Sequence, residues 1–239
     1  MIRLLHSPPG LGQVVALAMG MAEALDRWQA RPGEILTVVD PEGRYFRARL
    51  LSGLREAVVF EPLPPGIEPA RPRRLCPVIP DRERMLLILQ KGVELGATEI
   101  LPLISERSSA VGGVRHGQDK TAAWDRFVLK AARQCRRAII PVLHPARSLE
   151  QFFADPVVEQ RAFLDILESG IPLASWYRRC HDQPLAILSG PEGGWTDRER
   201  QLMLDRGAMA VSLGYRILRT ETAAIAAMAG LVTLDSAFT

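Results

Sequence analysis

Two segments near the carboxyl end of the chain share one order of local patterns: an apolar strand, a turn containing glycine, and a helix. The apolar run 184–189 passes into Ser-Gly-Pro-Glu-Gly-Gly-Trp, after which Thr196 and Glu199 have the spacing of a capping box. The strand predicted over 210–213 leads through Gly214 into an alanine-rich helix predicted over 220–234. Strand-to-helix connections of this kind predict an α/β domain with a mainly parallel sheet.

The same alternation extends upstream of these two segments. The spacing of apolar residues predicts helices over 81–95 and 119–138, and short apolar runs predict strands over 98–104 and 162–167. All of these elements belong to one predicted α/β domain.

The first seventy residues have a different pattern, typical of a small β-rich unit. Strands predicted over 34–40 and 44–51 flank the turn residues Pro-Glu-Gly and form a hairpin, and residues 57–60 add a further β-type run. Residues 61–77 contain six prolines, which resist both helix and sheet, so we interpret this stretch as a linker. The predicted domains are therefore residues 1–72 and 73–239.

Composition indicates an ordinary globular protein. The 239 residues are 47% apolar and 24% charged, and no apolar run approaches the roughly 20 residues of a membrane span. The amino terminus lacks the pattern of a secretory signal, so we expect a cytoplasmic protein with no membrane partner. The three cysteines and four histidines are too scattered for a metal site, so no metal is expected.

Both glycine-containing segments are candidates for ligand binding. In open α/β sheets, ligands bind beyond the carboxyl ends of the strands, and glycine lets a ligand press against bare backbone. Residues 189–196 place three glycines at such a point, although a turn without a ligand is the alternative. Neither the phosphate-loop pattern nor GxGxxG is present.

The second segment, residues 212–223, also carries charged groups. Arg216 and Arg219 precede an apolar helix that Thr220 or Glu221 can cap, so these residues have a structural alternative as caps and ion pairs. Charged groups beside an apolar surface are nevertheless typical of a binding site.

A basic stripe on the helix predicted over 119–138 is a candidate nucleic-acid surface. Its members recur at spacings of four, three and four, which places them on one helix face: Arg126, Lys130, Arg133 and Arg137. Such a stripe suits a phosphate backbone, and the net charge of +3 permits an anionic partner. A solvated helix face is the alternative.

Four segments together resemble a known family. LSGPEGGWTDRE and LGYRILRTETA resemble the knot-forming motifs of the SPOUT methyltransferases, and the second is similar to the motif of the RsmE family of 16S ribosomal RNA (uracil-N3) methyltransferases. KGVELGATEILPLISERS from Lys91 and KAARQCRRAIIPVLHP from Lys130 agree with that family in order and spacing. The resemblance spans residues 81–224, with a weaker match in the amino-terminal hairpin.

The resemblance implies a SPOUT-type α/β domain with a deep trefoil knot and a small amino-terminal PUA-like β-barrel that binds RNA. It implies S-adenosylmethionine as cofactor, a homodimer, and 16S ribosomal RNA of the small ribosomal subunit as partner. The residues it implies for cofactor binding are Leu188, Gly190, Glu192, Gly193, Gly194, Leu213, Gly214, Ile217 and Leu218.

The implied reaction, methylation of a uridine at N3, suggests roles for two further residues. We hypothesise that Arg219 orients the uracil or stabilises its developing anion, and that Glu221 accepts the N3 proton or fixes Arg219. A structural Arg–Glu pair at the helix start is the alternative. Two other functions stay open: a SPOUT methyltransferase acting on transfer RNA or a ribose 2′-hydroxyl, and a non-catalytic RNA-binding assembly protein.

Overall fold

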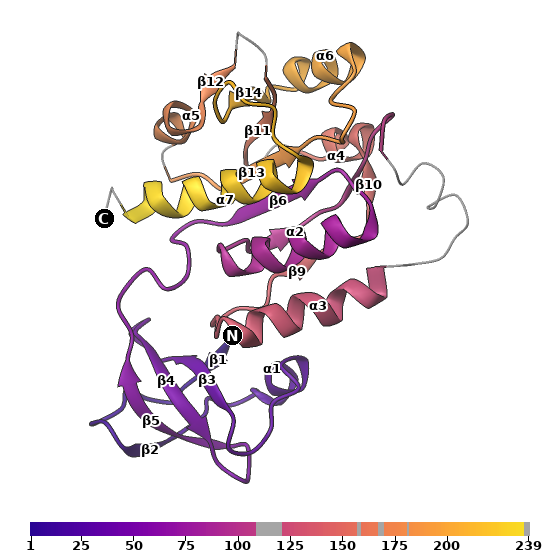
Figure 1. The fold of residues 1–239 in the computed structure, drawn as a ribbon. Coiled ribbons are helices and arrows are strands. Elements are labelled where there is room, and N and C mark those ends of the chain that lie inside the picture. The colour runs from indigo at the N-terminus through magenta and orange to yellow at the C-terminus, as the bar shows by residue number, and fades with distance from the viewer. Residues whose placement is uncertain (109–120, 157–158, 167–169, 181, 237–239) are drawn as a thin grey trace. The chain divides into compact units, whose positions relative to one another are not determined.

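A computed structural model describes residues 1–108, 121–156, 159–166, 170–180 and 182–236, and the chain divides into two compact units (Figure 1). The first unit comprises Met1–Ala70 and Leu129–Ile140, and the second comprises Arg71–Val128 and Pro141–Thr239. The main boundary therefore lies two residues before the predicted one. The inclusion of Leu129–Ile140 in the first unit was not predicted.

The first unit contains a five-stranded sheet, the short helix α1 (Ala22–Arg27) and, from Leu129 onward, the end of helix α3 (Thr121–Gln134). The strands lie in the order β1 (Ile2–Arg3), β3 (Ile35–Val39), β4 (Tyr45–Leu50), β5 (Glu56–Pro62) and β2 (Gln13–Ala16). β1 pairs in parallel with β3, and the other neighbours are antiparallel. An isolated antiparallel bridge between Leu4 and Leu17 links the chain next to β1 with the chain next to β2.

The hairpin of β3 and β4 confirms the predicted strand pair and its turn. The Asp40 carboxylate accepts hydrogen bonds from the backbone N–H groups of Glu42 at 3.0 Å and Arg44 at 2.9 Å. Gly43 adopts a φ of +81°, a conformation that glycine takes without steric cost. The Pro-Glu-Gly turn is thus held by local backbone and carboxylate contacts.

The predicted helix over 119–138 is shorter in the structure, and this changes the basic stripe. Helix α3 spans Thr121–Gln134, while residues 119–120 lie outside the described residues. Arg136 then takes a φ of +54°, which ends the helical conformation, so Arg137 cannot share a helix face with the other three cations. The prediction of a four-residue stripe on one helix face was therefore wrong for Arg137.

Arg137 is instead a buried structural residue of the first unit. Its Nε lies 3.0 Å from Oε2 of Glu68, and the same carboxylate accepts a hydrogen bond from the backbone N–H of Ala138 at 2.7 Å. Arg133 is partly buried, with Nη2 at 2.6 Å from Oε1 of Glu34. Of the four predicted cations, the two that are exposed are Arg126 and Lys130.

The second unit is built on a seven-stranded sheet in which every pairing is parallel, which confirms the predicted α/β class. The strand order is β12 (Ile171–Pro172), β14 (Met209–Ser212), β11 (Gln160–Leu164), β13 (Leu185–Ser189), β6 (Arg73–Pro77), β7 (Glu99–Ile100) and β9 (Val142–Leu143). A separate parallel pair joins β8 (Leu103–Ile104) to β10 (Arg147–Ser148).

Strand β6 corrects the prediction of a linker over 61–77. It lies between β13 and β7 near the middle of the sheet, and Leu75 and Cys76 are fully buried. Pro72 precedes the strand and Pro77 ends it, where a missing N–H does not interrupt the ladder. Counting prolines over a long window therefore concealed a short central strand.

Other strand boundaries differ more modestly from the predictions. The single strand predicted over 98–104 is two short strands, β7 and β8, separated by Leu101 and Pro102. The strand predicted over 162–167 is β11, and Leu167 lies outside the described residues.

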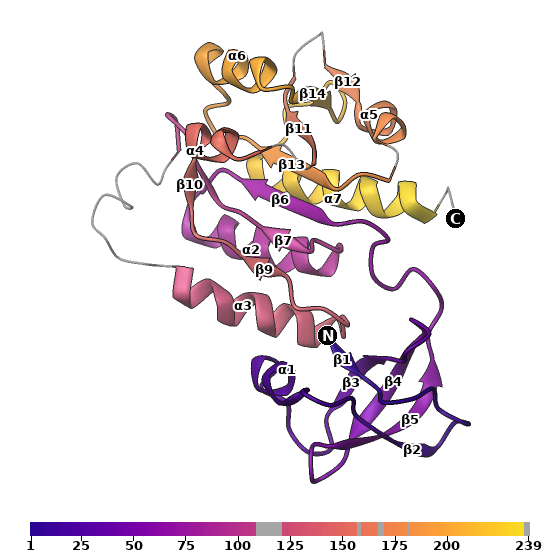
Figure 2. The ribbon, with the colours of Figure 1, turned by 180° about the vertical axis from the view of Figure 1, so that it is seen from behind.

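Helices cover both faces of the parallel sheet. On one face lie α2 (Arg82–Glu94) and α7 (Thr220–Ser236), in front of the strands in Figure 1 and behind them in Figure 2. On the other face α4 (Leu149–Ala154) and α6 (Asp197–Asp205) contribute to a core cluster with Cys76, Phe163 and Leu188. α5 (Leu173–Arg179) packs against α7. In the described ranges, no helix combines the length and apolar character needed to cross a membrane.

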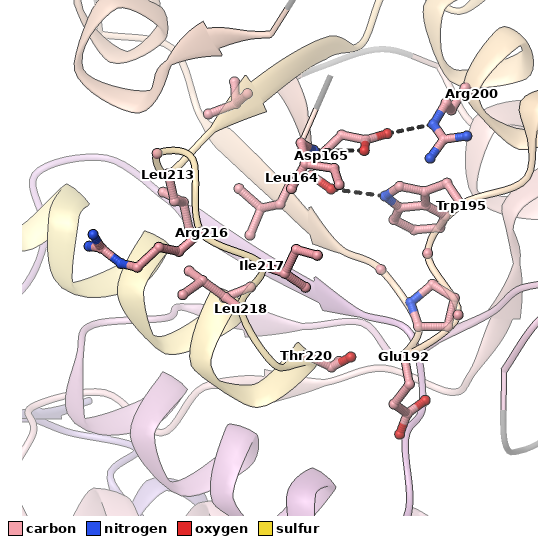
Figure 3. A pocket seen from close by; sticks show the side chains of 18 residues that line it. Leu164, Asp165, Glu192, Trp195, Arg200, Leu213, Arg216, Ile217, Leu218 and Thr220 are labelled. Atoms are coloured by element: carbon pink, nitrogen blue, oxygen red, sulfur yellow. Dashed lines mark hydrogen bonds and ion pairs between the residues drawn. The ribbon is translucent and has the colours of Figure 1, made fainter. Parts of the chain in front are cut away.

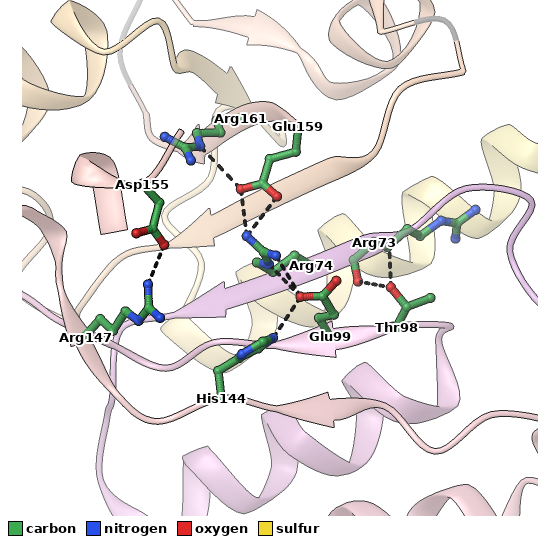
Figure 4. A network of polar contacts seen from close by, with 9 residues as sticks. All are labelled: Arg73, Arg74, Thr98, Glu99, His144, Arg147, Asp155, Glu159 and Arg161. Carbon is green, nitrogen blue, oxygen red and sulfur yellow. Dashed lines mark hydrogen bonds and ion pairs between the residues drawn. The ribbon is translucent and has the colours of Figure 1, made fainter. Parts of the chain in front are cut away.

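A charged network crosses the strands at the amino end of the sheet (Figure 4). Arg74 contacts Glu99 at 2.7 Å and Glu159 at 2.8 Å, and Nε2 of His144 lies 2.8 Å from the same Glu99 carboxylate. Burial alone would raise the pKa of Glu99, but hydrogen bonds from Arg74 and His144 outweigh it and hold that pKa below its ordinary value of 4.5. The ionised carboxylate thus stabilises the fold.

The network predicts a pH-dependent effect of Glu99→Gln. At pH 7 the variant loses the carboxylate charge in its hydrogen bonds with Arg74 and His144, so its free energy of unfolding should fall by about 1–3 kcal/mol. Because the folded pKa of Glu99 is depressed, its contribution is present above pH 4.5 and is lost as the pH falls below that value. Urea denaturation at pH 7 and pH 4 should therefore give a smaller difference from wild type at pH 4.

Glu94→Gln is the matched control for that measurement. Glu94 has a similar exposure to Glu99 but pairs with the more exposed Lys91 on the same helix. Removing the Glu94 charge should lower the free energy of unfolding by no more than about 0.5 kcal/mol at pH 7. An equal effect of the two variants, or a difference for Glu99→Gln that does not change with pH, would contradict the stabilising role of the network.

Candidate functional site

A pocket of about 320 Å³ lies at the carboxyl ends of β11, β13 and β14, at the edge of the sheet opposite the charged network (Figure 3). Three stretches of chain line it: residues 164–166 after β11, residues 190–195 after β13, and residues 213, 214, 216–218 and 220 after β14 and at the start of α7. This is where ligands bind in open α/β sheets.

Most of the residues predicted from the resemblance to bind a cofactor lie in this pocket. The eight that line it are Gly190, Glu192, Gly193, Gly194, Leu213, Gly214, Ile217 and Leu218. Leu188 is fully buried within β13 and belongs to the core cluster. It does not line the pocket, which begins after the end of its strand. The structure thus brings both glycine-containing segments to one site, while their binding role stays a prediction.

The first glycine turn is shaped by Trp195. A Cβ at Gly190 would lie 3.0 Å from the indole ring, so any larger residue would require the ring to shift. The indole Nε1 donates a 3.0 Å hydrogen bond to the carbonyl of Leu164 at the end of β11. The predicted capping box of Thr196 and Glu199 is confirmed at the start of α6. Hydrogen bonds therefore link the turn both to the end of β11 and to the start of α6.

An outer contact holds the same turn. Nη1 of Arg107 donates a 2.8 Å hydrogen bond to the carbonyl of Gly193, and Gly194 adopts a φ of +68°. Backbone groups of the turn are consequently fixed in direction, which favours a preformed binding surface.

Two charged residues of the pocket wall were not predicted. The side chain of Asp165 is only 4% exposed; its Oδ2 lies 2.6 Å from Nε of Arg200, and its Oδ1 accepts a 2.7 Å hydrogen bond from the backbone N–H of Ile166. The available signal was an acidic residue directly after an apolar strand. Its partner on α6 could not be identified without the fold.

The second segment forms the opposite wall. Gly214 has a φ of +109°, and its N–H donates to the Oγ of Ser212 at 3.1 Å. Ile217 is 84% exposed although it lines the pocket, and Arg216 extends away from the other labelled side chains in Figure 3. This side of the pocket is thus open and apolar at its rim.

Arg219 and Glu221 do not pair with each other in the structure. Arg219 is exposed and forms no ion pair among the described residues, whereas Glu221 is buried at the start of α7. The cation nearest to Glu221 is Arg84, whose Nε lies 3.7 Å from Oε2. The hypothesis that Glu221 fixes Arg219, and the alternative of a structural pair between them, are both replaced by a contact with Arg84.

Arg84 was missed because it lies more than 130 residues upstream of Glu221 in the sequence. It occupies the first turn of α2, and its Nη1 also lies 2.8 Å from Oε1 of Glu192 in the pocket. In the described part of the chain, no cluster of His, Cys, Asp and Glu could hold a metal ion.

Comparison with known proteins agrees with this architecture. A model of the RNA methyltransferase domain matches residues 68–232. Ribosomal RNA small subunit methyltransferase E of Synechocystis sp. is 33% identical over 208 residues, which cover 84% of this chain and 67% of the relative. The Mycobacterium bovis protein of the same name is 32% identical over 213 residues, covering 86% of this chain and 80% of the relative.

A solved structure is similar over almost the whole chain. Ribosomal RNA small subunit methyltransferase E from Neisseria gonorrhoeae, bound to S-adenosyl methionine, has 33% sequence identity and a TM-score of 0.67, and the match covers 98% of both chains. The chain described here belongs to the RNA methyltransferase family and, within it, to the ribosomal RNA small subunit methyltransferase E group.

Proposed function

We propose that this protein is an S-adenosylmethionine-dependent methyltransferase that methylates a uridine at N3 in 16S ribosomal RNA of the small ribosomal subunit. The observation that carries the proposal is the convergence of both glycine-containing segments on one pocket at the carboxyl edge of the sheet. Relatives that match most of this chain are named as small-subunit ribosomal RNA methyltransferases, and a solved structure of that name is bound to S-adenosyl methionine.

The pocket suits the methyl donor in size and chemistry. Its volume of about 320 Å³ is at the lower end of the range of roughly 300–1,000 Å³ for small-molecule sites. Apolar side chains such as Val211 and Leu218 can contact the adenine, and the bare backbone of the glycine turn can form hydrogen bonds. The residues that would hold the donor are those that line the pocket: Gly190, Glu192, Gly193, Gly194, Leu213, Gly214, Ile217 and Leu218.

The chain's own task in this reaction is to position the uracil and to take its proton. When bound, S-adenosylmethionine supplies a methyl group whose carbon–sulfur bond breaks, with the electron pair returning to sulfur, as uracil N3 forms its new bond. N3 first has to lose a proton, and Glu221 is a carboxylate beside the pocket that can accept it. Arg219 is exposed and lies in the chain between the pocket-lining residues Leu218 and Thr220, where its charge would stabilise the uracil anion.

We also infer finer features of the fold and assembly from the family resemblance. The second unit would contain a trefoil knot, with the chain after β14 returning across β11 and β13 to reach α7. The first unit would be a PUA-like β-barrel that binds RNA, and the Leu4–Leu17 bridge supports closure of its sheet. A homodimer and a cytoplasmic location complete the proposal.

The direct test is methyl transfer to defined RNA. The purified protein, small subunits lacking uridine N3 methylation and radiolabelled S-adenosylmethionine should yield label in 16S RNA that maps to N3 of one uridine. Label in transfer RNA or on a ribose would favour a different SPOUT target. Donor binding without transfer to small subunits or free RNA would favour a non-catalytic assembly protein.

The proposed chemistry predicts the behaviour of two variants. Loss of a general base typically costs 10²- to 10⁴-fold in rate, so Glu221→Gln should lower kcat by about that factor. Arg219→Ala should lower kcat about 10²-fold if it stabilises the developing anion. Isothermal titration of the donor should give affinities within about threefold of wild type. Wild-type turnover in both variants would remove these roles.

The two exposed cations of α3 predict a salt-dependent RNA contact. We propose that Arg126 and Lys130 contact phosphates, while Arg133 and Arg137 support the first unit. Reversing either exposed charge to glutamate should weaken RNA binding and reduce the slope of log affinity against log salt by about 0.7–0.9 per lost phosphate contact. Arg179→Glu, an exposed charge on α5, is the matched control and should leave both quantities unchanged. Identical salt slopes for all variants would contradict the contact.

A further inference from the structure

One guanidinium connects three carboxylates beside the pocket. Arg84 lies 2.8 Å from Oε1 of Glu192, 3.2 Å from Oδ2 of Asp81 and 3.7 Å from Oε2 of Glu221. The three acids come from different parts of the second unit: Asp81 caps α2, Glu192 belongs to the glycine turn, and Glu221 begins α7. The side chain therefore joins the turn that lines the pocket to the carboxylate proposed to take a proton.

The start of α2 fixes the direction of this side chain. Oδ1 of Asp81 accepts a 3.0 Å hydrogen bond from the backbone N–H of Arg84, while its Oδ2 contacts the guanidinium of the same residue. The N-cap thus holds Arg84 at two points. The helix itself is anchored by buried residues such as Met85 and Leu89. Arg84 is consequently presented to the pocket from a rigid element, which limits the entropy lost on pairing.

The contacts with Glu192 and Glu221 differ in kind. The 2.8 Å contact is a charge-assisted hydrogen bond that holds the Glu192 side chain in place. The 3.7 Å contact with Glu221 is too long for a hydrogen bond, and Oε2 of Glu221 is buried and accepts none. Arg84 thus lies beside the Glu221 carboxylate without engaging its Oε2 in a hydrogen bond.

We propose that Arg84 is a positioning residue for methyl transfer, which holds the Glu221 carboxylate in place while it fixes Glu192 in the wall of the pocket. This inference rests on the proposed function, since it assumes that Glu221 takes the uracil N3 proton. It gives Glu221 a contact with Arg84 in place of the predicted contact with Arg219. Arg84 itself does not touch the uracil.

The position of the three acids explains why the loss of Arg84 should slow methyl transfer. Arg84 contacts all three carboxylates, so replacing it removes a positive charge from beside the buried acid Glu221. Glu221 would then lose the contact that holds its side chain, and a displaced carboxylate would slow the chemical step. Binding of RNA through phosphates at other surfaces would be unaffected.

The test uses Arg84→Met, Arg84→Lys and the matched control Arg82→Met in the full-length protein. Arg82 lies in the same first turn of α2, is exposed and has no ion pair among the described residues, so its variant removes equal charge without touching the cluster. Arg84→Met should lower kcat for methyl transfer at least 10-fold with the KM for RNA changed less than threefold. Arg84→Lys should recover a substantial part of the rate, and Arg82→Met should stay within twofold of wild type.

A double-mutant cycle separates action through Glu221 from general damage. If Arg84 acts through Glu221, adding Arg84→Met to Glu221→Gln should slow the enzyme by no more than about twofold beyond Glu221→Gln alone. Independent, multiplicative losses would overturn the proposal, as would an unchanged kcat in Arg84→Met or a loss seen only in KM. If the wild-type protein does not methylate RNA, the proposed function fails; if wild type is active and the cycle is additive, only the role of Arg84 fails.

Discussion

Pairing of β13 with β6 on one side and β11 on the other, in the middle of a fully parallel sheet, is the constraint on which the rest of the second unit depends. Parallel pairing brings the carboxyl ends of β11, β13 and β14 to one edge, so three connections far apart in the sequence line a common pocket. It also gathers the amino ends at the opposite edge, where Arg74 joins Glu99 and Glu159. Both the pocket and the charged network therefore follow from one strand arrangement.

Much of this arrangement could be predicted because its signals are local. The apolar run before Gly190, the capping box at Thr196 and the apolar composition of α7 each arise from neighbouring residues, and the structure has these elements close to the expected positions. Prediction failed where composition was averaged, as over the prolines around β6. It also failed where a helix ended at a residue with positive φ, as at Arg136.

The polar partners of the site were beyond sequence reasoning for a different reason. The contacts of Asp165 with Arg200, and of Arg84 with Glu221, join residues separated by about 35 and more than 130 positions. No periodicity or spacing relates such residues; only the strand order does. The family resemblance predicted the segments that line the pocket. It did not predict that Arg84 and Arg200 form ion pairs with residues of the pocket wall.

The contact between Arg137 and Glu68 has a consequence for how the first unit can be separated from the rest. Glu68 is buried, and its carboxylate is satisfied by the guanidinium of Arg137 and by the backbone of residues 138 and 139. A fragment cut after residue 70 would keep the acid and lose every one of these donors, leaving an uncompensated charge in its interior. The amino-terminal sheet is thus not a detachable module: its fold is completed only after more than half of the chain has been synthesised.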